Sequence, residues 1–145
     1  RSVAVVGRNG SIDWLCGPRF DADACFAALL GTPDHGRWLM GPQDGAARVT
    51  RRYRPNTLIL ETRFETAEGA ATLIDFMPGH QTGSSIVRLV VGERGRIALK
   101  TELGLRFGYG AIVPWHTILE VGTRRPIAGP DLVLLRTPAQ RRGAE

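Results

Sequence analysis

Four carboxylate side chains in the sequence could take part in glycoside hydrolysis: Asp13, Asp21, Asp23 and Asp75. That reaction uses a pair of carboxyl groups, one to protonate the leaving oxygen and one to activate a water molecule. Asp21 and Asp23 stand before an apolar run and fit helix caps better, while Asp75 fits a partner at a strand end or turn. The carboxylates alone therefore do not identify an active site.

Other chemistries lack their sequence patterns. No phosphate-binding G-x-x-x-x-G-K-[ST] motif and no G-x-S-x-G nucleophile motif occurs. His35, His80 and His116 are far apart and give no zinc-ligand spacing, so we expect neither a metal nor a cofactor. Cys16 and Cys25 are too few for a secreted disulfide framework, which favours reduced thiols and a cytoplasmic protein.

The aromatic side chains suggest sugar recognition, because an aromatic ring complements the apolar face of a pyranose. The larger aromatic side chains considered for this role are Trp14, Phe20, Trp38 and Trp115. In a β domain the simpler explanation for all of them is packing in the core. Trp14 and Phe20 differ from the others in lying beside a loop that is rich in polar residues.

That loop, Pro18–Asp21, carries our candidate site residues. Loops at one end of a β scaffold commonly display recognition groups, and Arg19 offers five N–H donors to sugar hydroxyls or to a partner carboxylate. We take Trp14, Arg19, Phe20 and Asp21 as candidates for a substrate rim or an interdomain surface. The alternative is that Arg19 only pairs with Asp21 and that Asp21 only caps a helix.

The charge balance does not indicate a nucleic-acid-binding protein. The chain of 145 residues has 19 basic and 14 acidic side chains, but Lys100 is its only lysine. The densest basic cluster comprises Arg48, Arg51, Arg52 and Arg54. Only Tyr53 lies among them, so no ladder of aromatic rings is available for stacking bases. We predict a solvated strand face there and expect no nucleic acid; no apolar run reaches the roughly 20 residues that would span a membrane.

Most of the chain has hydrophobic residues with a period of two, which is typical of half-buried strands. Asn9–Gly10 predicts a hairpin turn between residues 3–6 and 12–15. Further strands are expected at residues 57–64, 71–77, 86–91, 97–107 and 131–137. One short helix is expected near residues 23–30, capped by Asp21 or Asp23. The sequence thus predicts an all-β fold, an antiparallel super-β-sandwich, because each apolar strand face must be covered by a second sheet.

Both ends of the sequence suggest a truncated domain. The first residue is Arg1 rather than Met, and the last predicted strand runs directly into a polar stretch at residues 138–145. We expect a sandwich that lacks its closing strands. Such a sandwich leaves a strand edge and an apolar face uncovered, which predicts marginal stability or association into a homo-oligomer.

Several blocks of the sequence resemble the glycoside hydrolase family 15 proteins of bacteria and archaea, which are trehalase-like and glucoamylase-like. The segment from Val6 to Asp21 (VGRNGSIDWLCGPRFD) is similar to the family's opening signature, which continues through residues 25–31. The later blocks lie at residues 52–62, 75–78, 106–110 and 113–115. They occur in the family's order and cover nearly the whole chain.

The resemblance implies that residues 1–145 are part of an N-terminal, trehalase-like β-sandwich domain. In the family this domain packs against a C-terminal α/α toroid, which hydrolyses α-glucosidic bonds with inversion by means of two Glu residues. The toroid has no counterpart in this chain, so the resemblance assigns no catalytic residue here. It implies a parent enzyme of the α,α-trehalase or glucan 1,4-α-glucosidase type, with trehalose or a maltooligosaccharide as substrate, and an inactive fragment.

The alternative is a stand-alone, non-catalytic β-sandwich that binds carbohydrate or serves a structural role. The two interpretations differ in the sequence that the open reading frame encodes after Glu145. A region of helical hairpins with two Glu residues supports the hydrolase, whereas a stop codon supports the stand-alone domain.

Overall fold

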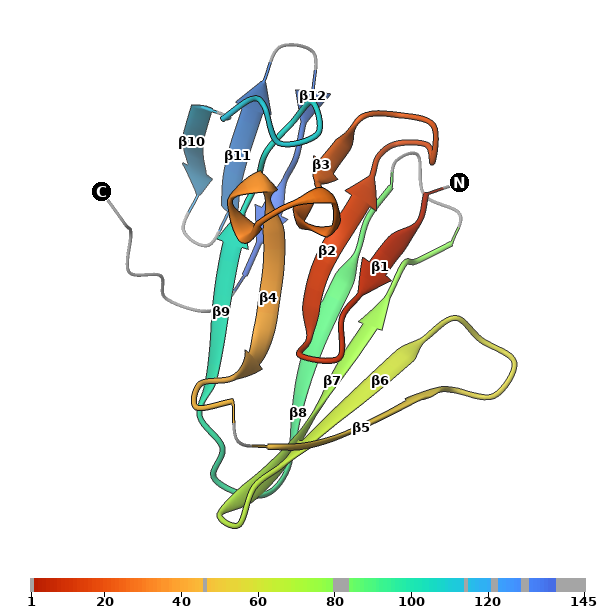
Figure 1. Ribbon diagram of the computed structural model, residues 1–145, viewed down its shortest axis with the longest axis vertical. Helices are drawn as coiled ribbons and strands as arrows, with labels where there is room; N and C mark the ends of the chain where they lie inside the picture. The colour runs from red at the N-terminus through yellow and green to blue at the C-terminus, as the bar shows by residue number, and fades with distance from the viewer. Residues whose placement is uncertain are drawn as a thin grey trace.

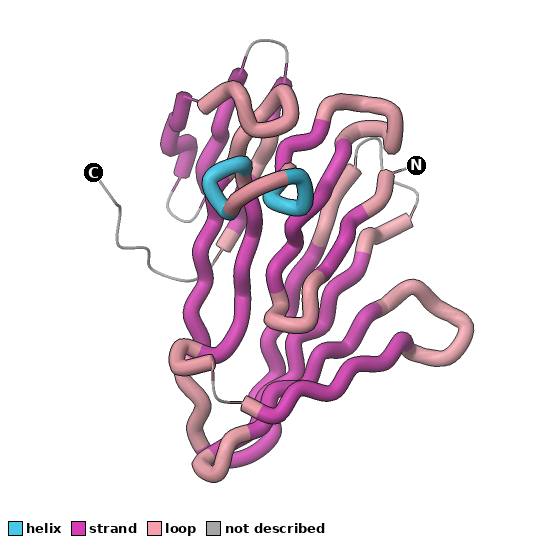
Figure 2. Tube along the Cα trace, viewed as in Figure 1, coloured by secondary structure: helices cyan, strands magenta, loops and turns pink. Residues whose placement is uncertain are grey.

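The computed structural model describes residues 2–45, 47–79, 84–113, 115–120, 123–128 and 131–137, and these form an almost entirely β structure (Figures 1 and 2). The strands are β1 Ala4–Val6, β2 Ser11–Cys16, β3 Ala24–Phe26, β4 Arg37–Pro42, β5 Arg48–Tyr53, β6 Leu60–Glu65, β7 Gly69–Phe76, β8 Val87–Gly95, β9 Leu99–Gly104, β10 Trp115–Glu120, β11 Thr123–Ala128, β12 Asp131–Leu132 and β13 Leu135–Arg136. Two 3₁₀ helices, η1 Ala28–Leu30 and η2 Pro33–His35, connect β3 to β4.

The strands form three antiparallel sheets. The first has the order β1-β2-β4-β9, with β3 also paired to β2, and the second has the order β5-β6-β7-β8. The third sheet consists of β10, β11 and β12, with β13 paired to β11. The first two sheets form the predicted sandwich, and Figure 1 shows β7 and β8 passing behind β1 and β2. The all-β, antiparallel prediction is confirmed.

Alternating side chains on β6 and β7 build the core on the inner face of the second sheet. On β6, Leu60 and Phe64 are buried, and on β7, Ala71 and Leu73 are buried. The first sheet contributes Ile12, which belongs to a cluster with Phe26, Leu105 and Phe107. Burial of a side chain such as leucine or phenylalanine stabilises the fold by about 1.5–3 kcal/mol. In a strand, the period of two places these buried side chains on one face of the sheet.

The predicted Asn-Gly hairpin is present between β1 and β2. Gly10 has a φ of +82°, which a glycine adopts without strain. The Asn9 side chain accepts a hydrogen bond from the Ser11 amide at 3.1 Å. An added Cβ at Gly10 would lie 2.1 Å from the Met40 carbonyl oxygen on β4. The turn therefore needs glycine both for its backbone angle and for its close approach to the neighbouring strand.

The helix expected near residues 23–30 is reduced to the single 3₁₀ turn of η1, and its first half is strand β3 instead. Ala24 to Ala27 are four consecutive buried residues, so the segment has no solvated face that an amphipathic helix requires. β3 pairs with β2, and the amides of Ala27 and Ala28 donate to the Gly36 carbonyl, both at 3.1 Å. Tertiary pairing therefore outweighs the local helix signal.

Several strand boundaries also differ from those predicted. Asn56 has a φ of +58° and lies inside a turn closed by the hydrogen bond from the Thr57 amide to the Arg54 carbonyl. The strand predicted from residue 57 therefore starts at Leu60, and Leu58 is 88% exposed. The strand predicted at residues 97–107 ends at Gly104, and β4 was not predicted. Residues 138–145 lie outside the described part of the chain. In the described residues no helix is long and apolar enough to cross a membrane.

Candidate functional site

Arg19 and Asp21 form a two-pronged ion pair within the predicted recognition loop. Arg19 Nε donates to Asp21 Oδ1 at 2.8 Å and Arg19 Nη2 donates to Asp21 Oδ2 at 3.0 Å. The pair is solvent-exposed, with 68% of the Arg19 side chain and 52% of the Asp21 side chain accessible. The hydrogen bond from Arg19 lowers the pKa of Asp21. Asp21 thus pairs with Arg19 and does not cap a helix.

Phe20 lies between these two residues and is 65% exposed. The Ala22 amide donates to the Arg19 carbonyl at 3.2 Å, which closes a tight turn around it. Phe20 therefore does not pack in the core. Its ring is available for contact with a ligand or with another part of a larger protein.

Trp14 lies on β2 and is half-buried against a small cluster formed by Cys16, Ala24 and Ala27. Burial raises the pKa of the Cys16 thiol, and the neighbouring Trp14 side chain opposes part of this rise. The Trp14 ring also contacts Tyr109, with ring centroids 6.0 Å apart and planes tilted by 36°. Core packing explains one edge of the indole, and Tyr109 covers another part of it.

Tyr109 was not singled out as a site residue by the sequence analysis. It lies in a loop closed by paired hydrogen bonds between Phe107 and Ile112, at 2.9 and 3.0 Å. The signal in the sequence was its position between Gly108 and Gly110. Such spacing allows a left-handed loop, but the sequence does not reveal which distant residue the ring will contact.

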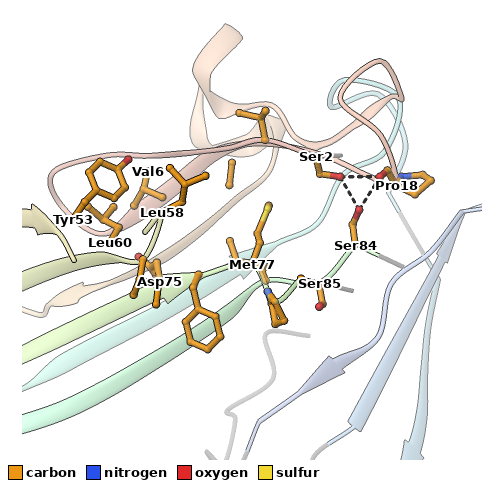
Figure 3. A pocket seen from close by; sticks show the side chains of 17 residues that line it. Ser2, Val6, Pro18, Tyr53, Leu58, Leu60, Asp75, Met77, Ser84 and Ser85 are labelled. Atoms are coloured by element: carbon orange, nitrogen blue, oxygen red, sulfur yellow. Dashed lines mark hydrogen bonds between the residues drawn. The ribbon is translucent and has the colours of Figure 1, made fainter. Parts of the chain in front are cut away.

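A groove of about 1010 Å³ lies between β1 and the second sheet (Figure 3). Its lining is mostly apolar and comes from β1, from the ends of β6 and β7, and from residues 84–86. Pro18 of the predicted loop lies at one end, where its carbonyl accepts hydrogen bonds from Ser2 Oγ at 2.9 Å and Ser84 Oγ at 2.7 Å. The candidate loop therefore borders the groove at this end.

The four carboxylates differ in their surroundings. Asp13 accepts a 2.5 Å hydrogen bond from Ser11 Oγ, and Asp75 is buried and paired with Arg88. Asp21 is held by Arg19. Asp23 is exposed on the short segment before β3. Three of the four side chains therefore have structural partners, and none is assigned a catalytic role.

Of the remaining aromatic candidates, only Trp38 has a side chain within the described part of the chain. Trp38 donates to Thr101 Oγ1 at 3.2 Å, and its ring lies 5.2 Å from the Arg88 guanidinium carbon, so it packs in the sandwich. The side chain of Trp115 lies outside the described part of the chain, as does His80. Within the described ranges, no group of three or more His, Cys, Asp or Glu side chains could hold a metal ion.

The basic cluster on β5 forms a solvated strand face, as predicted. Every residue of β5 except Val49 is exposed. Arg52 and Arg54 both bind Glu61 on the neighbouring strand, at 2.7 and 2.6 Å, and lower the pKa of Glu61. These two arginines are thus paired with a carboxylate of the domain itself.

Comparison with known proteins identifies the domain type. The family described as "Trehalase-like, N-terminal" matches residues 1–124. Trehalase 1 of Sulfolobus acidocaldarius is 35% identical over 107 residues, which is 73% of this chain and 18% of that protein. Trehalase 2 of the same organism is 28% identical over 138 residues, 95% of this chain and 21% of that protein. The trehalase of Mycolicibacterium smegmatis is 37% identical over 68 residues, 47% of this chain and 10% of that protein.

The chain therefore spans only about a tenth to a fifth of the length of these curated relatives. No solved structure matches it significantly. The family match covers most of the described residues, including both sheets of the sandwich, the loop from Pro18 to Asp21 and the groove. The chain belongs to the family of trehalase-like N-terminal domains.

Proposed function

We propose that residues 1–145 are part of the N-terminal domain of an inverting α-glucoside hydrolase of glycoside hydrolase family 15, with trehalose as its substrate. The observation that carries this proposal is the family match over residues 1–124, with relatives that are named trehalases. Among the α-glucosides considered, these names favour trehalose over a maltooligosaccharide. The catalytic acid and base belong to a helical domain outside this chain, and the sandwich is its scaffold.

The apolar groove supports the role of scaffold. Around it, Val3, Tyr53 and Leu58 are 54%, 59% and 88% exposed. Large apolar surfaces of this kind are characteristic of contacts with another protein surface. We assign the groove to the contact with the catalytic domain.

The exposed loop supports a role at the substrate rim. Arg19 and Asp21 are held together in a fixed geometry, and the exposed Phe20 lies between them. The charged pair retains unused donor and acceptor capacity for sugar hydroxyls. Trp14, Arg19, Phe20 and Asp21 accordingly remain our candidates for the rim or for the interdomain surface.

The compartment is inferred from the cysteines. Cys16 and Cys25 are buried thiols in the sandwich, which suits a reducing environment. We assign the parent enzyme to the bacterial cytoplasm. Cell fractionation followed by a trehalase assay of each fraction would check this assignment.

The decisive experiment uses the complete protein encoded by the gene. Inverting hydrolysis of α,α-trehalose gives one α-glucose and one β-glucose, whereas retention gives two α-glucose molecules. We expect NMR of the fresh products to show both anomers in equal amounts, and we expect no glucose release from residues 1–145 alone. The proposal fails if the complete protein lacks a following helical domain or does not hydrolyse trehalose.

A second experiment tests the loop in the complete enzyme. If Arg19 contacts the sugar, Arg19→Ala should lower kcat/KM by about tenfold, because a hydrogen bond from a charged group contributes about 1.5–3 kcal/mol. Arg94→Ala is the control, since Arg94 is also exposed and bound to a glutamate, Glu65, on the second sheet. Unchanged kcat/KM in Arg19→Ala would exclude Arg19 from the rim.

A further inference from the structure

We propose that Trp14 and Tyr109 form an aromatic platform that stacks against a glucose ring of an α-glucoside. This inference rests on the proposed function, because an α-glucoside is the ligand that the function supplies. The inference assigns a sugar-binding role to Tyr109, a residue that is not among the candidates for the substrate rim.

The first support is the way the backbone presents Tyr109. The φ of Tyr109 is +58°, an angle that residues other than glycine rarely adopt. Its two neighbours, Gly108 and Gly110, have φ values of +58° and +102°. A non-glycine residue in this conformation is strained. Strained backbone angles of this kind cluster at functional sites. The strained residue here is a tyrosine whose surface is 47% exposed.

The loop that contains Tyr109 is anchored on both sides of the tyrosine. Phe107 is 4% exposed and belongs to the main core, and it forms two backbone hydrogen bonds with Ile112. On the other side, His35 of η2 lies so close that a Cβ added to Gly110 would be 2.8 Å from its ring. The backbone around the exposed tyrosine is therefore well constrained, which reduces the conformational entropy lost when a ligand binds.

The second aromatic ring is fixed as well. The Trp14 indole is held by packing on Cys16, Ala24 and Ala27. With centroids 6.0 Å apart and planes tilted by 36°, the two rings form a shallow angle rather than a closed stack. A pyranose has an apolar face of C–H groups that fits against such surfaces.

Polar groups near the rings suit a sugar more than an apolar protein segment. Among the described residues, the Tyr109 hydroxyl has no hydrogen-bond partner, and the exposed Asp23 directly precedes Ala24, which pairs with Cys16 on the strand of Trp14. A hydroxyl and a carboxylate provide donors and acceptors for sugar hydroxyl groups. An interface with another protein is the competing assignment for the same rings.

The test measures sugar binding by the 145-residue chain with saturation-transfer NMR, using trehalose as the probe and mannitol as the non-pyranose control. Tyr109→Gly removes the ring and also relieves the strained backbone angle, so it should not unfold the loop. Asn56→Gly is the matched control, because Asn56 has the same φ of +58° and lies on the turn before β6. We expect trehalose to bind, with Tyr109→Gly at least about fivefold weaker and Asn56→Gly unchanged.

Equal trehalose binding by Tyr109→Gly and the unaltered chain would overturn the platform, as would the absence of binding to a chain whose amide NMR spectrum is that of a folded protein. If the chain does not fold alone, the same variants are compared in the complete enzyme, where a rise in KM specific to Tyr109→Gly is expected. Loss of thermal stability with unchanged KM would assign the rings to a protein interface. The proposed function is judged separately, by trehalose hydrolysis in the unaltered enzyme.

Discussion

Asp75 and Arg88 form a buried ion pair that holds the two sheets of the sandwich together. Arg88 Nε lies 2.8 Å from Asp75 Oδ1, and the side chains of Arg88 and Asp75 are 0% and 3% exposed, respectively. Arg88 also reaches the opposite sheet, where Nη1 donates to the Trp38 carbonyl and Nη2 donates to the Gly10 carbonyl, both at 2.6 Å. Neighbouring strands β7 and β8 thereby bind β4 and the β1–β2 turn through one guanidinium group.

Breaking this pair from one side should destabilise the domain strongly. Arg88→Met leaves the Asp75 carboxylate buried without its cation, which costs about 3–5 kcal/mol in comparable cases. Arg52→Met is the control, because that side chain is 78% exposed in its ion pair with Glu61 and should change stability by less than about 1 kcal/mol. Urea unfolding followed by circular dichroism measures both. The Arg88→Met/Asp75→Asn double variant should lose less than the sum of the single variants, and strict additivity would contradict the coupling.

The turn at Gly10 gives a second test of the inter-strand contact. Gly10→Ala combines a φ of +82° with a Cβ placed 2.1 Å from the Met40 oxygen, so we expect a loss of about 3 kcal/mol or more. Gly45→Ala is the matched control, since Gly45 has a φ of +66° but no described atom within 4 Å of its added Cβ. That change should lose only about 1 kcal/mol. Similar losses in the two variants, measured by thermal unfolding, would show that Met40 moves aside.

The sequence predicted features of the fold that depend on local periodicity. The alternation in Leu60, Thr62 and Phe64 identified a strand with one buried face, and all three side chains are buried. The same reasoning failed for residues 24–27, where the apolar run was assigned to a helix. Their burial comes from pairing with β2 and from the carbonyl of Gly36, and neither partner is visible in the local sequence.

The candidate site was predicted only where its residues are neighbours in sequence. Arg19 and Asp21 are two positions apart, and their pairing was considered from the sequence alone. Trp14 and Tyr109 are separated by 95 positions, and the groove joins Ser2, Pro18 and Ser84. Such contacts depend on strand order and register, which periodicity does not specify.

Acidification should destabilise the domain through carboxylates whose charged form is stabilised by hydrogen bonds from neighbouring side chains. The carboxyl groups with a pKa lowered in the folded state include Asp21, Glu61, Glu65, Glu93 and Glu102. For Glu61 the main causes are its hydrogen bonds with Arg54 and Arg52. Because the pKa is lowered on folding, this stabilisation is present above the unfolded pKa, about 4.3 for glutamate, and is lost as the pH falls through the folded value.

Glu61→Gln should therefore lower stability at neutral pH and flatten the decline of stability below about pH 4.3. Glu68→Gln is the control, because Glu68 is exposed and forms no ion pair with the described residues. Urea midpoints measured from pH 7 to pH 3 provide the comparison. Parallel pH profiles for Glu61→Gln and the unaltered chain would contradict the assignment.

The outer edge of β8 should cause the 145-residue chain to self-associate. β8 is the last strand of the second sheet, and within the described ranges no strand pairs with its free edge. Leu89, Val90 and Val91 are 47%, 48% and 46% exposed. A long edge strand with exposed apolar side chains is a template for pairing with another chain.

The sequence of β8 favours an antiparallel pair of β8 strands from two copies, centred on Val90. When two identical antiparallel strands pair around a twofold axis, directly opposed residues must point to the same face of the sheet. Their positions therefore differ by an even number, and the axis passes through a residue rather than between two residues. Centring on Val90 places Leu89 opposite Val91 and Arg88 opposite Gly92. Centring on Val91 instead opposes Arg88 and Arg94 and places Leu89 against Glu93, which is unfavourable. A register shift in the pairing with β7 comes after Gly92 and limits the paired segment.

Val90→Lys should therefore abolish association, because it places two lysines opposite each other at the centre of the pair. Leu58→Lys is the control, since Leu58 is 88% exposed but lies in the turn before β6. Sedimentation velocity over a hundredfold range of concentration should show a concentration-dependent dimer for the unaltered chain and for Leu58→Lys, and a monomer for Val90→Lys. A monomeric unaltered chain throughout that range would contradict the prediction, and equal dimerisation of Val90→Lys would place the interface elsewhere.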